Sequence, residues 1–197
     1  MSQKLNALNS ITRLRYCLFI IWLISFCSCT ASHYITQEPD GKKARDLSRK
    51  ISKKITLLQN DLIALSDETD NSEARQLAQI SINYSLHLAG EYRLVQPPYF
   101  HNILVRIGIK DRGLCYHWTE DLFNRLTSME LKSFILHRGV AYRGSNLREH
   151  NCVVVTARGQ DFNEGIVLDP WRDSGDLYWG RVNADRYPWE ERRQVLD

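Results

Sequence analysis

The spacing of the hydrophobic residues changes half-way along the chain, and this change limits the possible folds. In the first half, hydrophobic residues recur at steps of three and four from Leu47 to Leu65, which predicts an amphipathic helix over residues 42–66. Three more helices are expected, one ending near Ala89, one over Tyr99–Ile107 and one from Cys115 to about Thr127. The second half contains four short β-prone runs: Phe134–Tyr142, Cys152–Thr156, Gly165–Leu168 and Leu177–Val182. Helices followed by a cluster of strands predict an α+β domain with a mostly antiparallel sheet.

The composition excludes several classes of protein. Hydrophobic residues make up 43% of the 197 residues and charged residues 25%, which excludes a collagen, a wholly disordered chain and a polytopic membrane protein. The net charge of +3 is matched by Lys4, Arg13 and Arg15 near the amino terminus. The rest of the chain is electrically balanced, so no overall basic field indicates a nucleic-acid partner.

The amino-terminal segment has the pattern of a targeting signal. The basic residues precede an apolar stretch over residues 16–26, which is short beside the roughly 20 residues of a membrane-spanning helix. Small residues follow, as in a secretory signal peptide. The sequence Phe26-Cys27-Ser28-Cys29 resembles a bacterial lipoprotein signal, in which the chain is cut before a cysteine that is acylated with fatty acids such as palmitate. Cleavage after Ala31 and an uncleaved anchor remain open.

This resemblance implies a lipoprotein of the bacterial cell envelope, held on a membrane and facing the periplasm or the exterior. Residues 1–28 are then the signal peptide, Cys29 is the lipidation site, and residues 29–41 form a tether. Residues 42–197 form a single domain, with a helical extension over 42–98 and a catalytic core over 99–197. The basic first half of the helix over 42–66 either is a solvated face or contacts anionic headgroups.

Three separate residues have the chemistry of a nucleophilic site. Cys115 follows a turn at Gly113 and begins a helix, where the helix dipole and free N–H groups favour the reactive thiolate. His150 lies at the entrance of the β-branched run Cys152–Val155, and Asp169 ends the apolar run Ile166–Leu168. If these two strands pair, the carboxylate lies beside the imidazole and orients it toward the thiol.

The order Cys115, His150 and Asp169 resembles the papain-like superfamily, and within it the transglutaminase-like branch. The resemblance covers residues 99–185 and implies a nucleophile-bearing helix packed on a mostly antiparallel sheet. It further implies a thiol hydrolase or acyltransferase that attacks an amide or peptide-like bond without a cofactor, with a protein, a peptide or a cell-wall peptide as substrate. Papain-like proteases carry a glutamine shortly before the cysteine, whereas no glutamine lies between Gln96 and Cys115. The second oxyanion donor is therefore open between Trp118, His117 and a backbone amide.

Other interpretations use the same side chains. Cys115 and Cys152 can form a structural disulfide in an exported protein, and the chain is then a non-enzymatic envelope adaptor or assembly factor. Cys115, His117, His150 and Cys152 also offer a ligand set for zinc, although the favoured site holds no metal. Trp118 and Trp171 either pack in the core or line a substrate groove. The run Glu190–Arg193 is expected to be a solvated tail.

Overall fold

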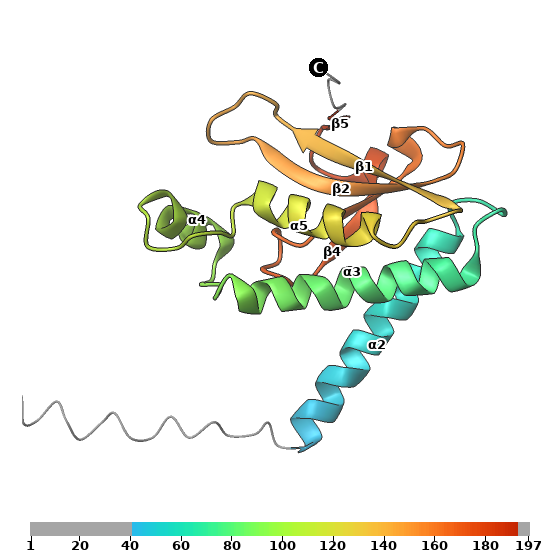
Figure 1. The fold of residues 1–197 in the computed structure, drawn as a ribbon, viewed down its shortest axis with the longest axis horizontal. Coiled ribbons are helices and arrows are strands. Elements are labelled where there is room, and N and C mark those ends of the chain that lie inside the picture. The colour runs from blue at the N-terminus through green and yellow to red at the C-terminus, as the bar shows by residue number, and fades with distance from the viewer. Residues whose placement is uncertain (1–40, 193–197) are drawn as a thin grey trace, which may run out of the picture. The chain divides into compact units, whose positions relative to one another are not determined.

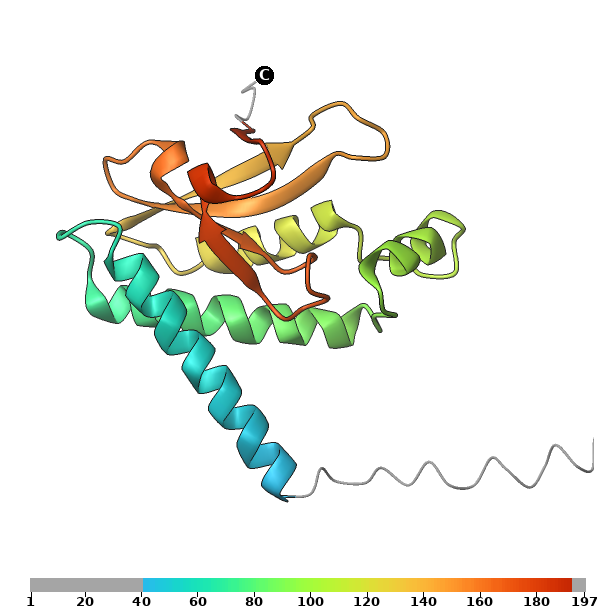
Figure 2. The same cartoon turned by 180° about the vertical axis from the view of Figure 1, so that it is seen from behind.

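Within residues 41–192, which a computed structural model describes, four α-helices precede a five-stranded sheet (Figures 1 and 2). The predicted signal peptide, the predicted lipidation site Cys29 and the predicted tether up to residue 40 lie outside the described residues. The helices are α2 (Gly41–Ile63), α3 (Asn71–Glu91), α4 (Pro98–Arg106) and α5 (Cys115–Thr127). No helix in this part of the chain combines the length and the apolar character needed to cross a membrane.

Local sequence signals explain where the helices begin and end. The side chain of Asp70 accepts a hydrogen bond from the N–H of Glu73 at 2.7 Å and caps α3, as expected for an aspartate before a helix. Pro98 occupies the first position of α4, where its missing N–H costs nothing. All four predicted helices are present, and α5 has the predicted bounds.

The five strands form one antiparallel sheet in the order β4-β3-β2-β1-β5. They are β1 (Phe134–Ala141), β2 (His150–Ala157), β3 (Ile166–Asp169), β4 (Tyr178–Arg181) and β5 (Trp189–Glu191), with 3₁₀ turns η1 (Phe162–Glu164) and η2 (Val182–Ala184). The first four strands lie side by side in chain order, as short connections favour. The predicted α+β class with an antiparallel sheet is confirmed.

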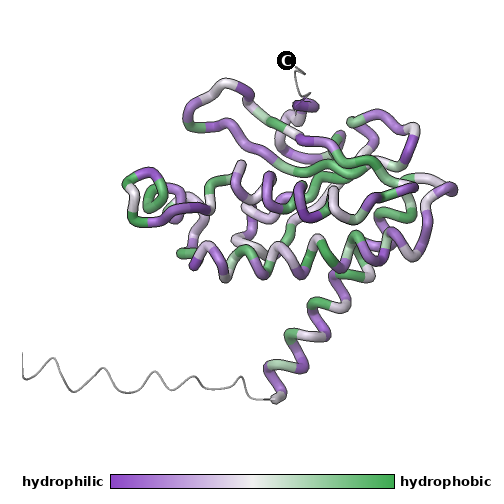
Figure 3. The backbone as a smooth tube through the Cα atoms, viewed as in Figure 1, coloured by the Kyte–Doolittle hydropathy of each residue, from purple (hydrophilic) through white to green (hydrophobic). Residues whose placement is uncertain are grey.

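Helix α5 lies between the sheet and α3, and one hydrophobic core joins these layers (Figures 1 and 2). Every residue of β2 is buried, and Val153 and Val155 pack in the same cluster as Leu122 and Leu126 of α5. Figure 3 shows the hydrophobic residues concentrated in the centre of the sheet. This packing fixes the start of α5 beside the start of β2.

The alternate residues of β2 face the other side of the sheet, because successive side chains of a strand point to opposite faces. There Cys152 and Val154 pack with Val167, Val182 and Trp189. The Sγ atom of Cys152 lies over Gly139, where an added Cβ would approach it to 2.6 Å. The two cysteines that follow Cys29 in the chain therefore occupy different layers.

The expectation of a solvated tail over Glu190–Arg193 is wrong for its first residues, since β5 pairs with Gly139–Ala141 of β1. Trp189 explains the difference: its ring is 7% exposed, and its Nε1 atom donates to Asp185 at 3.0 Å. Arg192 then forms an ion pair with Glu149 at 2.5 Å. A buried tryptophan thus holds a charged segment against the edge of the sheet.

Candidate active site

The turn before α5 brings Cys115 to the helix amino terminus. Gly113 has a φ angle of +118°, and a Cβ atom placed there would lie 2.2 Å from Nε2 of His101. His101 is fully buried, accepts the N–H of Val95 at 3.2 Å and donates to the carbonyl of Arg112 at 2.9 Å. Only glycine fits both this conformation and this space.

Two side chains of the first turn of α5 hold the turn in place. Nδ1 of His117 accepts the N–H groups of Gly113 and Leu114, each at 3.2 Å, so this nitrogen is unprotonated. Nε1 of Trp118 donates to the carbonyl of Gly113 at 2.9 Å. Nδ1 of His117 and Nε1 of Trp118 are therefore committed to the turn, and neither residue lines the cavity over Cys115.

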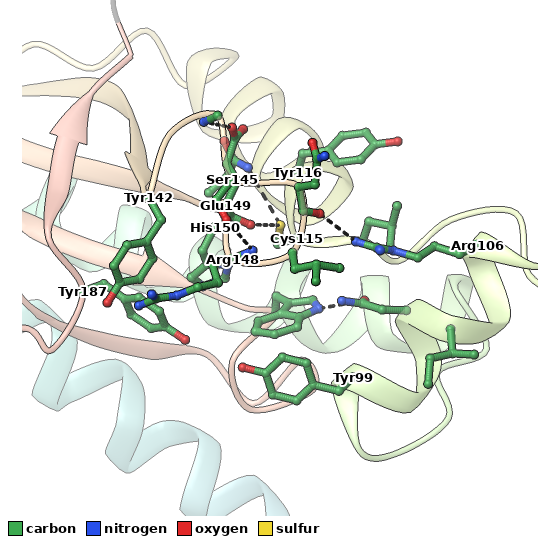
Figure 4. Close-up of a pocket in the computed structure, with 18 residues that line it drawn as sticks. Tyr99, Arg106, Cys115, Tyr116, Tyr142, Ser145, Arg148, Glu149, His150 and Tyr187 are labelled. Carbon is green, nitrogen blue, oxygen red and sulfur yellow. Dashed lines mark hydrogen bonds between the residues drawn. The ribbon is translucent and has the colours of Figure 1, made fainter.

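The thiol of Cys115 is half-buried and lies against the start of β2 (Figure 4). It contacts the carbonyl of Glu149 and Nδ2 of Asn151, each at 3.8 Å from the sulfur. The N–H groups of Cys115 and Tyr116 belong to the first turn of a helix, so they have no intrahelical acceptor. The sulfur thus lies at the amino-terminal end of α5, between a carbonyl oxygen and the amide donor of Asn151.

The imidazole of His150 lies between the thiol of Cys115 and the buried carboxylate of Asp169. Its Nε2 atom lies 2.7 Å from Oδ2 of Asp169, whose side chain is fully buried, so Nδ1 is left for Cys115. Burial alone lowers the pKa of the His150 imidazole, but hydrogen bonds and charge interactions with Asp169 and Cys115 outweigh burial and raise this pKa to about 9. The ring is therefore an imidazolium at neutral pH.

Aromatic rings enclose the imidazole of His150. The ring centroids of Trp171, Tyr187 and Trp189 lie 4.8, 4.9 and 5.4 Å from that of His150. A cation over aromatic faces is stabilised by their quadrupoles. The aromatic enclosure excludes water and fixes the ring plane.

An arginine continues the chain of charges behind Asp169. The Nε atom of Arg172 donates to Oδ2 of Asp169 at 3.0 Å, and its Nη atoms form a bidentate pair with Asp185 at 3.0 and 2.8 Å. Burial raises the pKa of the Asp185 carboxyl, but hydrogen bonds from Arg172 and Trp189 outweigh burial and lower it below the usual range. Arg172 thus lies between two buried carboxylates and neutralises charge on both.

A cavity of about 770 Å³ opens over Cys115 and His150 (Figure 4). One wall comes from α4, which contributes Tyr99 and Arg106, and another from the connection between β1 and β2, which contributes Leu147 and Arg148. The volume is in the range of small-molecule and peptide sites.

The structure brings Cys115, His150 and Asp169 together, as their order in the sequence suggested. Trp171 lines the cavity, whereas Trp118 is fully buried and packs on Tyr92, so it is not in a groove. The sequence predicted no role for Asn151. The alternation of side chains along a strand could have identified it, because it places the residue after His150 on the face of β2 that packs against α5.

The alternatives based on Cys152 do not fit this arrangement. Both Cys115 and Cys152 are free thiols in the structure, so the expected alternative of a disulfide is not formed. Burial raises the pKa of the Cys152 thiol well above its usual value. Within residues 41–192 no group of three or more His, Cys, Asp or Glu side chains is arranged to hold a metal ion.

Comparison with known protein families, with curated proteins and with solved structures found no match to this chain.

Proposed function

We propose that the protein is a thiol hydrolase or acyltransferase of the papain-like, transglutaminase-like type, acting on an amide or peptide-like bond. The observation that carries the proposal is the position of His150, which contacts the Cys115 thiol on one side and the Asp169 carboxylate at 2.7 Å on the other. The cavity over the sulfur gives a substrate access to it.

The proposed reaction follows from where the proton lies in the pair of Cys115 and His150. His150 is the protonated member of its pair with Cys115 and holds the proton that the thiol has given up, so the sulfur attacks the carbonyl carbon of the amide as a thiolate. As the tetrahedral intermediate collapses, the C–N bond breaks and His150 gives its proton to the leaving amine. The resulting thioester is then attacked by water or by a second amine, which loses a proton to His150, and the C–S bond breaks to release the thiolate beside the imidazolium, as at the start. Asp169 keeps the ring oriented throughout.

Charge on the carbonyl oxygen needs donors near the sulfur. We assign this role to the first-turn N–H groups of α5 and to Nδ2 of Asn151, which lies 3.8 Å from Sγ of Cys115. Such donors stabilise an oxyanion because they already point to where the charge develops. Asn151 takes the place of the glutamine that is missing before Cys115.

Alkylation by iodoacetamide tests the proposed nucleophile. We expect Cys115 to react at pH 7 at least about tenfold faster than an unperturbed thiol, because only the thiolate reacts, and we expect His150→Gln to remove this enhancement. Cys152 serves as the internal control and stays unlabelled until the protein unfolds. Labelling of Cys115 that is slow and independent of His150 would contradict the proposal.

The alternative of a non-enzymatic adaptor makes a different prediction. Protein isolated from the envelope would then gain two daltons on reduction, with Cys115 and Cys152 as the pair. We expect no such change, because both thiols are free and lie in different layers.

We also propose that the protein is exported and anchored to a membrane of the bacterial envelope through acylated Cys29. The pattern of residues 13–29 supports this. Incorporation of labelled palmitate that is lost on Cys29→Ser is the expected result, and incorporation that persists would exclude Cys29 as the acylation site.

A further inference from the structure

Two guanidinium groups face the cavity from opposite sides of Cys115 (Figure 4). Arg106 belongs to α4, and its Nη2 atom donates only a long hydrogen bond, 3.4 Å, to the carbonyl of Asn146. Arg148 belongs to the connection between β1 and β2, and its guanidinium lies 4.1 Å from the ring centroid of Tyr142. Among residues 41–192 neither arginine forms an ion pair with a carboxylate.

No carboxylate on the cavity wall neutralises these two charges. Glu149 is the one acidic residue that lines the cavity, and its carboxylate is committed elsewhere: one oxygen accepts the N–H of Gly144 at 2.8 Å and the other pairs with Arg192 at 2.5 Å. Asp169 is fully buried behind His150. The cavity therefore presents a positive field to anything that approaches the sulfur.

The remaining wall suits a peptide chain. Tyr99, Tyr116 and Tyr187 line it together with Leu147, and Tyr99, Tyr116 and Leu147 are exposed by 64%, 48% and 81%. Aromatic rings and a leucine offer apolar contacts between the two charged groups. A guanidinium binds a carboxylate through two parallel hydrogen bonds.

Building on the proposed function, we propose that the substrate is an acidic peptide or peptide-like amide. Its carboxylates, one on each side of the bond attacked by Cys115, bind to Arg106 and Arg148. The two arginines thus determine specificity without contacting the reacting atoms.

Two alkylating agents of similar size, one charged and one neutral, test the proposal. Iodoacetate is an anion and iodoacetamide is neutral, so the ratio of their rates at Cys115 reports the field at the sulfur and cancels any change in thiol reactivity. We expect Arg106→Gln and Arg148→Gln each to lower this ratio about threefold, and the double variant about tenfold, at low ionic strength. The differences shrink in 1 M salt, where charges are screened within about 3 Å.

Arg75→Gln is the matched control, because Arg75 is exposed on α3 and does not line the cavity. A second measurement uses peptides: triglutamate is expected to protect Cys115 from iodoacetamide at least about fivefold better than triglutamine, and this preference disappears in the double variant. An unchanged rate ratio in the double variant, or equal protection by the two peptides, would overturn the proposal.

These readouts separate the two proposals. Slow labelling of the unmodified protein by iodoacetamide, with no dependence on His150, contradicts the thiol enzyme. The ratio of the two rates and the ratio of protection by the two peptides are independent of how reactive the thiol is, and they decide the preference for an acidic substrate alone.

Discussion

Asn151 is the residue whose role is least visible in the sequence and most dependent on geometry. Its amide points at the sulfur of Cys115 from the strand that also carries His150. In the proposed reaction, a neutral amide in this place would stabilise a tetrahedral oxyanion without competing for the thiol proton.

We therefore expect Asn151→Ala to weaken binding of a peptide aldehyde about 100-fold, because the aldehyde forms a tetrahedral adduct with the thiolate and places an oxyanion beside the missing amide. Alkylation by iodoacetamide forms no oxyanion, so its rate falls at least about tenfold less than the aldehyde affinity. Equal losses in both measurements would show that Asn151 acts on the thiol alone. Asn151→Asp provides the comparison with a side chain of the same size.

At the scale of single elements, the turn before α5 decides where Cys115 lies. Gly113 leaves no space for a side chain, since His101 fills the position that a Cβ would occupy. Gly113→Ala is expected to destabilise the fold by about 3 kcal/mol or more, through strain and displacement of a buried hydrogen-bonded histidine.

The free energy of unfolding in urea measures this effect, and the alkylation rate of Cys115 reports whether the turn still presents the thiol. Gly90→Ala is the control: this glycine lies within α3, and an added Cβ meets nothing within 4 Å. That change should stabilise the helix by roughly 0.5–1 kcal/mol. Similar effects of the two substitutions would contradict the packing described for Gly113.

The same element shows how much of the structure the sequence pattern can predict. Helix α5 was predicted with its bounds because Gly113 and the apolar spacing of Leu122 and Leu126 agree. β2 and β3 were predicted from β-branched runs, and their pairing brings the start of β2, with His150, close to the end of β3, with Asp169. The pattern of β5 was hidden, because two of its three residues are charged and its pairing depends on the buried ring of Trp189. The roles of Trp118 and Asn151 depend on three-dimensional contacts that spacing alone does not fix.

At the scale of the whole molecule, the buried ion pairs that join His150, Asp169, Arg172 and Asp185 link the free energy of unfolding to pH. The pKa of His150 is raised from 6.5 to about 9, so the folded state holds this proton more tightly than the unfolded state. The stabilisation is complete below pH 6.5 and is lost as the pH rises through about 9. Its size is on the order of 3 kcal/mol, since one pKa unit corresponds to ~1.4 kcal/mol.

We expect the unmodified protein to lose stability between pH 6 and pH 10 more steeply than His150→Gln, in which this titration is absent. Urea unfolding of both proteins across that range measures the difference, and other titrating groups cancel in the comparison. Parallel pH profiles for the two proteins would refute a raised pKa for His150.

The separation of the two thiols by the sheet has a consequence for oxidative damage. Cys152 is fully buried on the face opposite α5, so within residues 41–192 Cys115 has no neighbouring thiol to rescue it. Peroxide would oxidise Cys115 to a sulfenic acid, and its return to the thiol requires a small reductant or another protein to enter the cavity. Reduction of the oxidised Cys115 therefore needs a second molecule. A ligand that occupies the cavity blocks this reduction as well as the attack of peroxide.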